Sequence, residues 1–231
     1  MFCVLFEVHP RPDQWDAYLG YATQLRPKLE RMDGFIDNIR YRSLAREGWI
    51  LSLSTWRDEK SLVRWRVDAE HHAVQDKGRT EVFLDYHLRI GPVTRDTSLA
   101  GDALPEERLD ETVIGAGTTV VLINASEPPD PHAPMDPKRR AASLGLDITA
   151  TGLVGFDVFE AVLTPGDYIV MSTWRNEANA RAFDASAPTP RDARLRRVRV
   201  VRDYGMFDRR EAPQYYPERR PREQEHGRVR P

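Results

Sequence analysis

The feature that most constrains the fold of this chain is an internal repeat. The segment Ser54–Glu59 reads Ser-Thr-Trp-Arg-Asp-Glu, and Ser172–Glu177 reads Ser-Thr-Trp-Arg-Asn-Glu, 118 positions further along. This spacing is much longer than the roughly 20–50 residues of a solenoid unit. The repeat therefore indicates a duplicated domain, in which each copy carries the elements of one module.

Three further matches occur in the same order in both copies. The first is Val4–Phe6 with Val121–Ile123, and the second is Gly34-Phe35 with Gly155-Phe156. The third comprises six positions from Asp85 to Asp96, which match six positions from Asp192 to Asp203 at a constant offset of 107. Loops that lose residues after a duplication change the offset but keep the order. The matches therefore support the duplication along the whole chain.

Hydrophobic periodicity predicts the same elements in each copy: a strand, an amphipathic helix, a hairpin, a second helix and a last strand. In the first copy these are a strand at 2–9, a helix with apolar residues from Trp15 to Leu29, a hairpin of 35–44 and 49–56, a helix from Asp58, and a strand at 81–93. In the second copy they are 118–125, 137–144, 153–163 with 167–174, 176–185, and 194–202. We also expect the second helix of the first copy to break or bend before His71.

The order β-α-β-β-α-β predicts an α+β fold of tandem ferredoxin-like modules, each with a four-stranded antiparallel sheet and helices on one face. A second sheet must cover the bare face. Two modules can do this within one chain, or each can pair with another chain in a homodimer. The expected boundaries are 1–95 for the first module, 96–117 for a linker, 118–210 for the second module, and 211–231 for a disordered tail rich in proline and arginine.

Composition and charge argue against several classes of protein. The net charge of -2 gives no reason to expect nucleic acid or a membrane as a partner. The first apolar run ends at Glu7, too early for a signal peptide, and no stretch approaches the roughly 18 apolar residues of a transmembrane helix. Cys3 is the single cysteine, which excludes an internal disulfide. We therefore expect a cytoplasmic protein.

Short motifs along residues 2–95 carry a resemblance to a known family. They are Leu25-Arg26-Pro27, Gly34-Phe35-Ile36, Arg40-Tyr41 with Ser43-Leu44, Leu51–Ser54 followed by Trp56–Glu59, Trp65-Arg66, Glu70-His71, Gln75, Gly78-Arg79, and Asp85-Tyr86 with Leu88-Arg89. Together they resemble the antibiotic biosynthesis monooxygenase family, which the second copy matches only in outline. The resemblance implies a dimeric α+β barrel and oxidation of a small aromatic or hydrophobic molecule without a cofactor.

The helical segment after the hairpin differs most between the copies. Trp65 becomes Phe183, and the pair His71-His72 has no counterpart in 185–188. A histidine here could act as a general base or as a ligand to heme iron. The alternative is a histidine at a helix end that only bonds to solvent or to a carbonyl. We expect the active pocket in the first module, with His71, His72 and Trp65 as catalytic candidates.

Four further residues are candidates for binding the substrate. Asn38 and Arg40 share one face of a strand by its period of two, and Tyr41 and Tyr86 can supply donors or pocket walls. An oxygenase of the kind that the resemblance implies needs a base to form the substrate anion and donors to hold its developing charge. The alternative for Arg40 is a surface ion pair. The histidines lack metal-ligand spacing, so we expect no metal site.

Heme is the alternative cofactor. The heme-degrading branch of the superfamily resembles this chain in a Trp followed by a His on this helix, which would make His71 or His72 the axial ligand. That branch also has an Asn on the first strand, where the first copy has Glu7 and the second has Asn124. A composite pocket that joins Asn124 to Trp65 and His71 is a further possible arrangement.

Three functions remain open. The first is a monooxygenase that oxidises a small aromatic or hydrophobic substrate in the first-module pocket. The second is a heme-binding, heme-degrading or heme-dependent enzyme. The third is a non-catalytic binding or assembly module, in which the repeat serves dimerisation. We prefer the first, because of the resemblance to the family and because the helix with Trp and His occurs in one copy only.

Overall fold

The structure covers both copies of the repeat but not all of the segments that join and follow them. The computed structural model describes residues 1–99, 116–127, 136–186, 190 and 192–208. The tail expected at 211–231 lies outside these ranges, as do residues 100–115 of the expected linker. Every predicted strand and helix lies inside them.

The first module has the predicted order of elements. They are β1 (Phe2–Pro10), α1 (Trp15–Leu29), β2 (Phe35–Ser43), β3 (Ile50–Trp56), α2 (Glu59–Arg66), α3 (Ala69–Lys77), a π-helical turn (Gly78–Val82) and β4 (Phe83–Asp96). The expected break before His71 lies between α2 and α3. There the Asp68 side chain accepts hydrogen bonds from the backbone N–H groups of Glu70 and His71 and so caps α3.

The second module has the same order with one addition. Its elements are β5 (Thr119–Ser126), α4 (Pro137–Ser143), β6 (Leu153–Ala161), β7 (Asp167–Trp174), α5 (Glu177–Ser186), β8 (Arg194–Arg199) and β9 (Arg202–Gly205). The single last strand expected at 194–202 is in fact two strands. β8 pairs with both β5 and β4, whereas β9 turns back and pairs with His87–Ile90 of β4.

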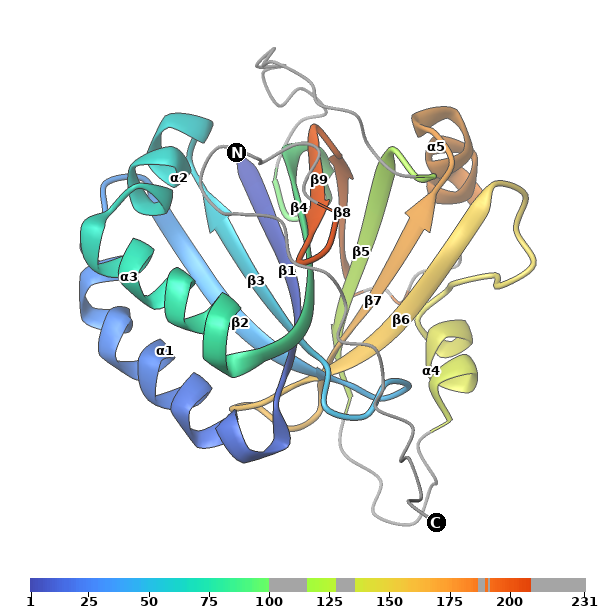
Figure 1. Ribbon diagram of the computed structural model, residues 1–231. Helices are drawn as coiled ribbons and strands as arrows, with labels where there is room; N and C mark the ends of the chain where they lie inside the picture. The colour runs from blue at the N-terminus through green and yellow to red at the C-terminus, as the bar shows by residue number, and fades with distance from the viewer. Residues whose placement is uncertain (100–115, 128–135, 187–189, 191, 209–231) are drawn as a thin grey trace, which may run out of the picture.

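The two modules close one barrel within the chain. Each module contributes four antiparallel strands, and the modules join where β2 pairs with β6 and where β4 pairs with β8. Figure 1 shows the resulting barrel, with α1, α2 and α3 outside the first sheet and α4 and α5 outside the second. The chain therefore covers the bare face of each sheet by itself, and the fold is the expected α+β barrel.

The strand register shows that the modules are related by approximate two-fold symmetry. Leu5 of β1 lies opposite Arg89, and its repeat Leu122 lies opposite Arg196, which confirms the offset of 107 between the last strands. The repeated tryptophans have a packing role in both copies. The Trp56 indole donates to Ser54 Oγ at 2.9 Å, and an equal bond joins the repeated pair in the second module.

The match of Gly34 with Gly155 is wrong by three residues. Gly34 has a φ of 83°, and its carbonyl accepts from the backbone N–H of Arg57. Gly152 has a φ of 86° and accepts in the same way from Arg175, so it is the true equivalent. Both positions need glycine, because a side chain rarely adopts this left-handed conformation.

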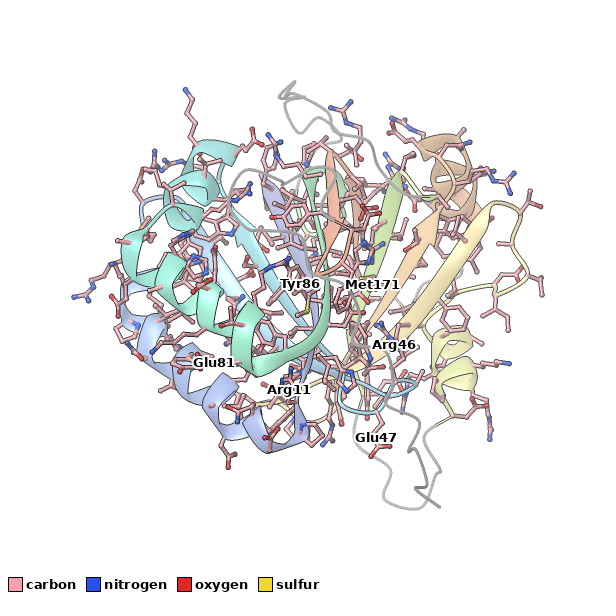
Figure 2. The ribbon with its side chains drawn as sticks, viewed as in Figure 1. Arg11, Arg46, Glu47, Glu81, Tyr86 and Met171 are labelled. Atoms are coloured by element: carbon pink, nitrogen blue, oxygen red, sulfur yellow. The ribbon has the colours of Figure 1, made fainter. Side chains whose placement is uncertain are left out.

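Apolar side chains fill three separate spaces. One cluster lies inside the barrel, a second lies between the second sheet and α4 and α5, and the rest lies between the first sheet and α1–α3. Figure 2 shows Tyr86 and Met171 in the central part of the molecule. In the ranges that the structure describes, no helix is long and apolar enough to cross a membrane.

Candidate active site

A cavity of about 410 Å³ lies between α1–α3 and the outer face of the first sheet. This volume is within the usual range for small-molecule sites, about 300–1,000 Å³. The helices contribute Ala22, Leu25, Leu29, Leu62, Trp65, Arg66, His71, His72 and Gln75, and the sheet contributes Val4, Phe6, Asn38, Arg40, Ser52, Ser54, Trp56, Tyr86, Leu88 and Ile90. The remaining lining residues are Val67, Arg79 and Tyr204.

The sheet floor of this cavity has a polar half and an apolar half. Strand register places Arg40, Ser52, Phe6 and Leu88 in one row, in that order across β2, β3, β1 and β4. The next row is Asn38, Ser54, Val4 and Ile90. The polar half therefore lies on β2 and β3 and the apolar half on β1 and β4.

The equivalent space in the second module is filled. Phe183 replaces Trp65 and stacks on Trp174 with 4.7 Å between ring centroids. It packs in one buried cluster with Leu144, Val158 and Val170. Since the two modules share a fold, the cavity is a property of the first module's side chains.

His71 is held tightly by its surroundings. Its ring stacks on Trp65 with centroids 4.2 Å apart and planes inclined by 15°, and its Nδ1 lies 2.8 Å from the Trp65 carbonyl oxygen. A carbonyl only accepts, so Nδ1 carries the hydrogen and Nε2 is left as an acceptor. The Gln75 side-chain nitrogen lies 3.1 Å from Nδ1 and 3.3 Å from Nε2, and because Nδ1 is a donor, Nε2 is the atom that can accept from it. The break between α2 and α3 makes this stacking possible, because it lets α3 fold back over Trp65.

Burial lowers the pKa of His71 from 6.5 to about 4, against the opposing effects of the Trp65 carbonyl and Asp68. The imidazole is therefore neutral at pH 7. A base with so low a pKa transfers protons poorly near neutral pH. His71 is thus poorly suited to be the base that ionises a ligand.

Arg79 is a lining residue that the sequence analysis missed as a site residue. It is almost fully buried, at 3% exposed, and donates to the Tyr86 hydroxyl at 2.9 Å and to the Met206 carbonyl at 3.0 Å. It stands in the π-helical turn, a feature often found at functional sites. The signal in the sequence was the Gly78-Arg79 motif, which contributed to the resemblance but was given no role.

Six of the seven expected site residues line the cavity: Asn38, Arg40, Trp65, His71, His72 and Tyr86. Tyr41 does not, and its assignment as a pocket residue is corrected here. Because side chains alternate along β2, Tyr41 points to the face opposite Arg40, into the barrel, where Asn124 donates to its hydroxyl at 3.2 Å.

The geometry does not fit a heme bound through His71. Nε2, the nitrogen with a lone pair, lies beside Gln75, and one ring face is covered by Trp65. Asn124 is also in the wrong place for the composite pocket, because it lies inside the barrel and accepts from Arg196 at 3.0 Å. The sheet therefore separates Asn124 from Trp65 and His71.

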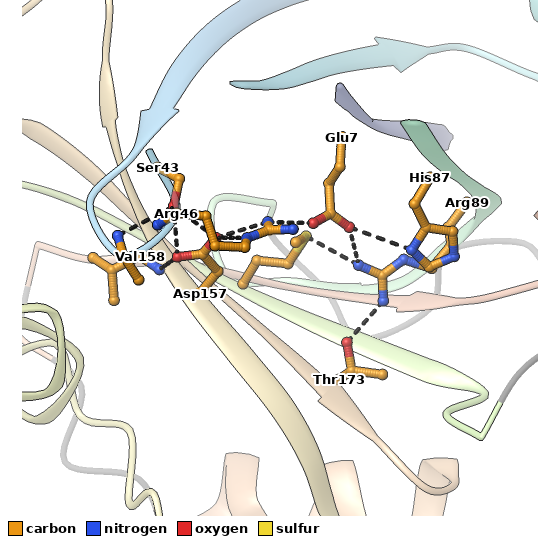
Figure 3. A network of polar contacts seen from close by, with 10 residues as sticks. Glu7, Ser43, Arg46, His87, Arg89, Asp157, Val158 and Thr173 are labelled. Atoms are coloured by element: carbon orange, nitrogen blue, oxygen red, sulfur yellow. Dashed lines mark hydrogen bonds and ion pairs between the residues drawn. The ribbon is translucent and has the colours of Figure 1, made fainter. Parts of the chain in front are cut away.

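A second cavity, of about 700 Å³, is lined by residues of both modules, several of which form a polar network (Figure 3). Glu7 accepts from Arg89 at 2.7 Å and from Arg46 at 2.6 Å, and Arg46 also pairs with Asp157 at 2.7 Å. Burial favours the neutral form of Glu7, but the two guanidinium groups outweigh it and hold the pKa of this carboxyl below its usual range. For Asp157, burial prevails and raises the pKa. These contacts join the modules, so we assign the network a structural role.

The chain matches one family model and a named relative. Residues 1–77 match the family model described as antibiotic biosynthesis monooxygenase. A protein of Pyricularia oryzae named jasmonate monooxygenase is 48% identical over 223 residues, which cover 94% of this chain and 99% of that protein.

Two solved structures are similar over most of the chain. An aldoxime dehydratase in complex with butyraldoxime has a TM-score of 0.53 at 12% identity, covering 87% of this chain and 79% of its own. An anthrone oxidase-like protein has a TM-score of 0.35 at 16% identity, covering 89% and 93%. At such low identity the dehydratase supports the fold alone.

Proposed function

Since this chain belongs to the antibiotic biosynthesis monooxygenase family, we propose that its first module oxidises a small, largely apolar substrate in the cavity under α1–α3. The observation that carries the proposal is the contrast between the two copies. The first module combines an open cavity with the stacked pair of Trp65 and His71, and the second fills the same space with apolar side chains. The second module then serves as the partner that closes the barrel.

The proposed chemistry uses dioxygen and no cofactor. The substrate carries an activated CH₂ group and loses a proton, which passes to solvent, to give an anion. The anionic carbon bonds to dioxygen, the resulting peroxide takes up a proton, and loss of water leaves a carbonyl group. Oxidation of one CH₂ to a carbonyl balances the reduction of one dioxygen to a carbonyl oxygen and a water, so no other reductant is consumed.

The residues of the cavity have distinct parts in this scheme. Trp65 and the apolar side chains of α1 and β1 exclude water from the reacting carbon. His71 stays neutral and, stacked on Trp65, forms part of the cavity wall that positions the substrate. Arg79 and Tyr86 form a hydrogen-bonded wall at the β4 side. Because His71 is a weak base, the substrate has to be acidic enough to ionise with the help of positive charge in the cavity.

The test is dioxygen consumption by the purified protein, with jasmonate and a series of phenols as substrates. Jasmonate comes first because the 48% identical relative carries that name. We expect Trp65→Phe to lower kcat/KM at least tenfold, since the smaller phenyl ring covers less of the His71 imidazole and enlarges the cavity. Trp49→Phe is the matched control: Trp49 stacks on His9 outside the cavity and should leave kcat/KM unchanged. Equal loss in both variants, or full activity in both, contradicts the assignment of the site.

A hemin titration separates the main alternative. The proposal predicts a nonsaturating response without a shifted Soret band in wild type, His71→Ala and His72→Ala. A sharp band that one histidine variant abolishes would establish a heme protein instead. Absence of oxygen consumption with all substrates, together with absence of heme binding, would favour the non-catalytic module.

A further inference from the structure

The second module contributes to the wall of the first module's cavity through β9. This strand lies antiparallel to β4 along His87–Ile90 (Figure 1). Tyr204 is the one described lining residue that comes from the second module, and Arg66 of α2 lies over its ring at 5.7 Å. The Met206 carbonyl, just after β9, accepts from Arg79 at 3.0 Å. A displacement of β9 from β4 would therefore open the cavity on its β4 side.

Asp203 fixes the other face of β9. Because side chains alternate along a strand, Asp203 and Tyr204 point to opposite faces of the sheet. Tyr204 shares the cavity face with its register partner Leu88. On the other face, His87 Nε2 of β4 lies 2.5 Å from Asp203 Oδ1. The pair of His87 and Asp203 thus ties β9 to β4 directly behind the residue that forms the cavity wall.

The two-fold symmetry of the barrel repeats this contact with one change. The offset of 107 makes Asp96 the equivalent of Asp203, and it makes Arg194 the equivalent of His87. Arg194 donates to Asp96 from Nε at 3.1 Å and from Nη2 at 2.6 Å. An arginine keeps its charge at all ordinary pH values, whereas a histidine changes its charge near neutral pH. Of the two equivalent contacts, one is therefore permanent and the other can respond to pH.

His87 interacts with a second carboxylate, because its Nδ1 lies 3.7 Å from Glu7 Oε1 (Figure 3). A neutral imidazole has one N–H, so a ring that donates to Asp203 has a lone pair on the nitrogen near Glu7. The protonated ring has an N–H on both nitrogens and attracts both carboxylates. The His87 side chain is 41% exposed, so it exchanges protons with solvent. The other charged residues that line this cavity in the described ranges are Arg46, Asp85, Arg89, Asp157 and Asp208.

We propose that His87 is a positioning residue for the first-module cavity and acts through Asp203 and β9. The protonated ring forms an ion pair with Asp203 and keeps Tyr204 in the cavity wall. When the ring loses its proton, only a hydrogen bond remains, and β9 separates from β4 more often. The cavity should therefore be more closed at about pH 6 than at about pH 8. This regulation acts on the cavity of the proposed function, so its effect on turnover rests on that function.

Hydrogen exchange of single backbone amides, followed by NMR, tests the position of β9 without turnover. The Met206 N–H donates to the Tyr86 carbonyl at 3.0 Å and reports on β9. The Thr97 N–H donates to the Leu195 carbonyl at 3.0 Å and reports on the equivalent contact at Arg194. Protection factors are corrected for the intrinsic exchange rate at each pH. We expect that of Met206 to fall at least about threefold from about pH 6 to about pH 8, and that of Thr97 to stay constant.

Four variants assign the pH dependence to the proposed pair. His87→Arg introduces the permanent cation of the equivalent contact and should keep the Met206 protection high at both pH values. His87→Gln and Asp203→Asn each remove the ion pair and should keep this protection low at both. Arg194→His is the reciprocal change and should transfer the pH dependence to Thr97. In the first three variants, unchanged protection of Thr97 shows that the rest of the barrel is folded.

Turnover gives a second measurement once a substrate is known from dioxygen consumption. Between about pH 6 and about pH 8, KM of wild type should rise at least about twofold relative to KM of His87→Arg, while the ratio of their kcat values stays constant. A change in KM alone is expected because β9 shapes the cavity wall and contains no reacting group. The comparison with His87→Arg at each pH removes any effect of ionisation of the substrate itself.

Three results would overturn the inference. The first is a Met206 protection factor in wild type that does not depend on pH, and the second is an equal fall at Thr97. The third is a pH dependence that survives in His87→Gln, which would assign it to other groups such as Asp85 and Asp157, whose pKa burial raises.

The two proposals can fail separately, because hydrogen exchange needs no substrate. If the protection of Met206 depends on His87 and pH but no substrate is oxidised, the proposed function fails and the role of His87 stands. If a substrate is oxidised and the protection of Met206 is the same at both pH values in every variant, the oxygenase stands and the role of His87 fails.

Discussion

At the scale of single residues, His71 gives the sharpest prediction. Because burial lowers its pKa from 6.5 to about 4, its ring should remain neutral down to about pH 5. The unfolded chain takes up this proton near pH 6.5, so the free energy of unfolding falls as the pH drops from 6.5 to 4. An NMR titration of the His71 ring, assigned with His71→Gln, measures the pKa. A value near 6.5 would contradict the buried, stacked geometry.

How far residue roles could be predicted depended on where each residue stands. Asn38 and Arg40 follow the alternation of a regular strand, so their shared face was accessible to sequence reasoning. The same rule, applied strictly, would have placed Tyr41 on the opposite face. Arg79 stands in a π-helical turn, where neither the helical nor the strand period predicts the direction of a side chain.

At the scale of elements, α3 covers the cavity and is fixed mainly through its first turn, where His71 stacks on Trp65. None of its residues is fully buried, and it is tied to α1 by the pairs of Lys28 with Asp68 at 2.8 Å and with Glu70 at 3.4 Å. We expect α3 to open more readily than the sheet, because local stability follows buried contacts. It is thus the element through which a substrate can enter.

Asp68→Ala tests this role of α3. It removes the N-cap, which costs about 1 kcal/mol of helix stability, and the pair with Lys28. We expect faster hydrogen exchange of the α3 amides and a KM that rises more than kcat falls. Asp16→Ala, in the first turn of α1, is a control that should leave exchange in α3 unchanged. An unaltered exchange pattern in Asp68→Ala would mean that the sheet-side contacts hold α3.

The glycine turns before β2 and β6 provide a matched pair of substitutions. At Gly34 an added Cβ would lie 2.6 Å from Ser61 Cβ, and the positive φ adds strain of about 1 kcal/mol or more. Gly34→Ala and Gly152→Ala should therefore each lower the free energy of unfolding in urea by at least about 1 kcal/mol. Gly155→Ala, where nothing lies within 4 Å of the added atom, should change it by less than about 0.5 kcal/mol. If Gly155→Ala were more destabilising than Gly152→Ala, Gly155 would be the equivalent of Gly34 after all.

The elements themselves were largely predictable because each carries its own period and end signals. Asp58 and Asp68 cap α2 and α3, and the change of period separates helices from strands. The division of the last strand into β8 and β9 was not predictable. It depends on β9 pairing with β4, a contact between modules that no local pattern encodes.

At the scale of the whole molecule, closure of the barrel within one chain was also beyond sequence reasoning, since either kind of closure buries the same sheet face. The structure shows how the symmetry of a module pair persists in one chain. Arg89 reaches Thr173 of the second module at 2.7 Å, and its repeat Arg196 reaches Thr55 of the first at 3.4 Å.

The two symmetric arginines differ in their partners within their own modules. Arg89 pairs with Glu7, whereas Arg196 is bonded to Asn124, the repeat of Glu7. A carboxylate at one position and an amide at the other make the first arginine site an ion pair and the second a hydrogen bond from a charged guanidinium to a neutral amide. Of these two sites, the first should therefore carry a dependence on pH and the second should not.

Glu7→Gln tests that difference. It leaves the buried Arg89 without its carboxylate, and loss of one partner of a buried pair costs about 3–5 kcal/mol. The lowered pKa of Glu7 means that its stabilising effect is complete above about pH 4.5, the ordinary value, and is lost as the pH falls through the pKa of the folded state. Compared with wild type, the variant should have a much lower free energy of unfolding in urea at pH 7, and the difference should be smaller at lower pH.

The exposed Glu30→Gln, which removes only the surface pair with Arg26, is the control and should lower the free energy of unfolding by less than about 1 kcal/mol at both pH values. A deficit for Glu7→Gln that is small, or equal at both pH values, would show that Arg46 and Thr173 hold the modules together without the charge of Glu7.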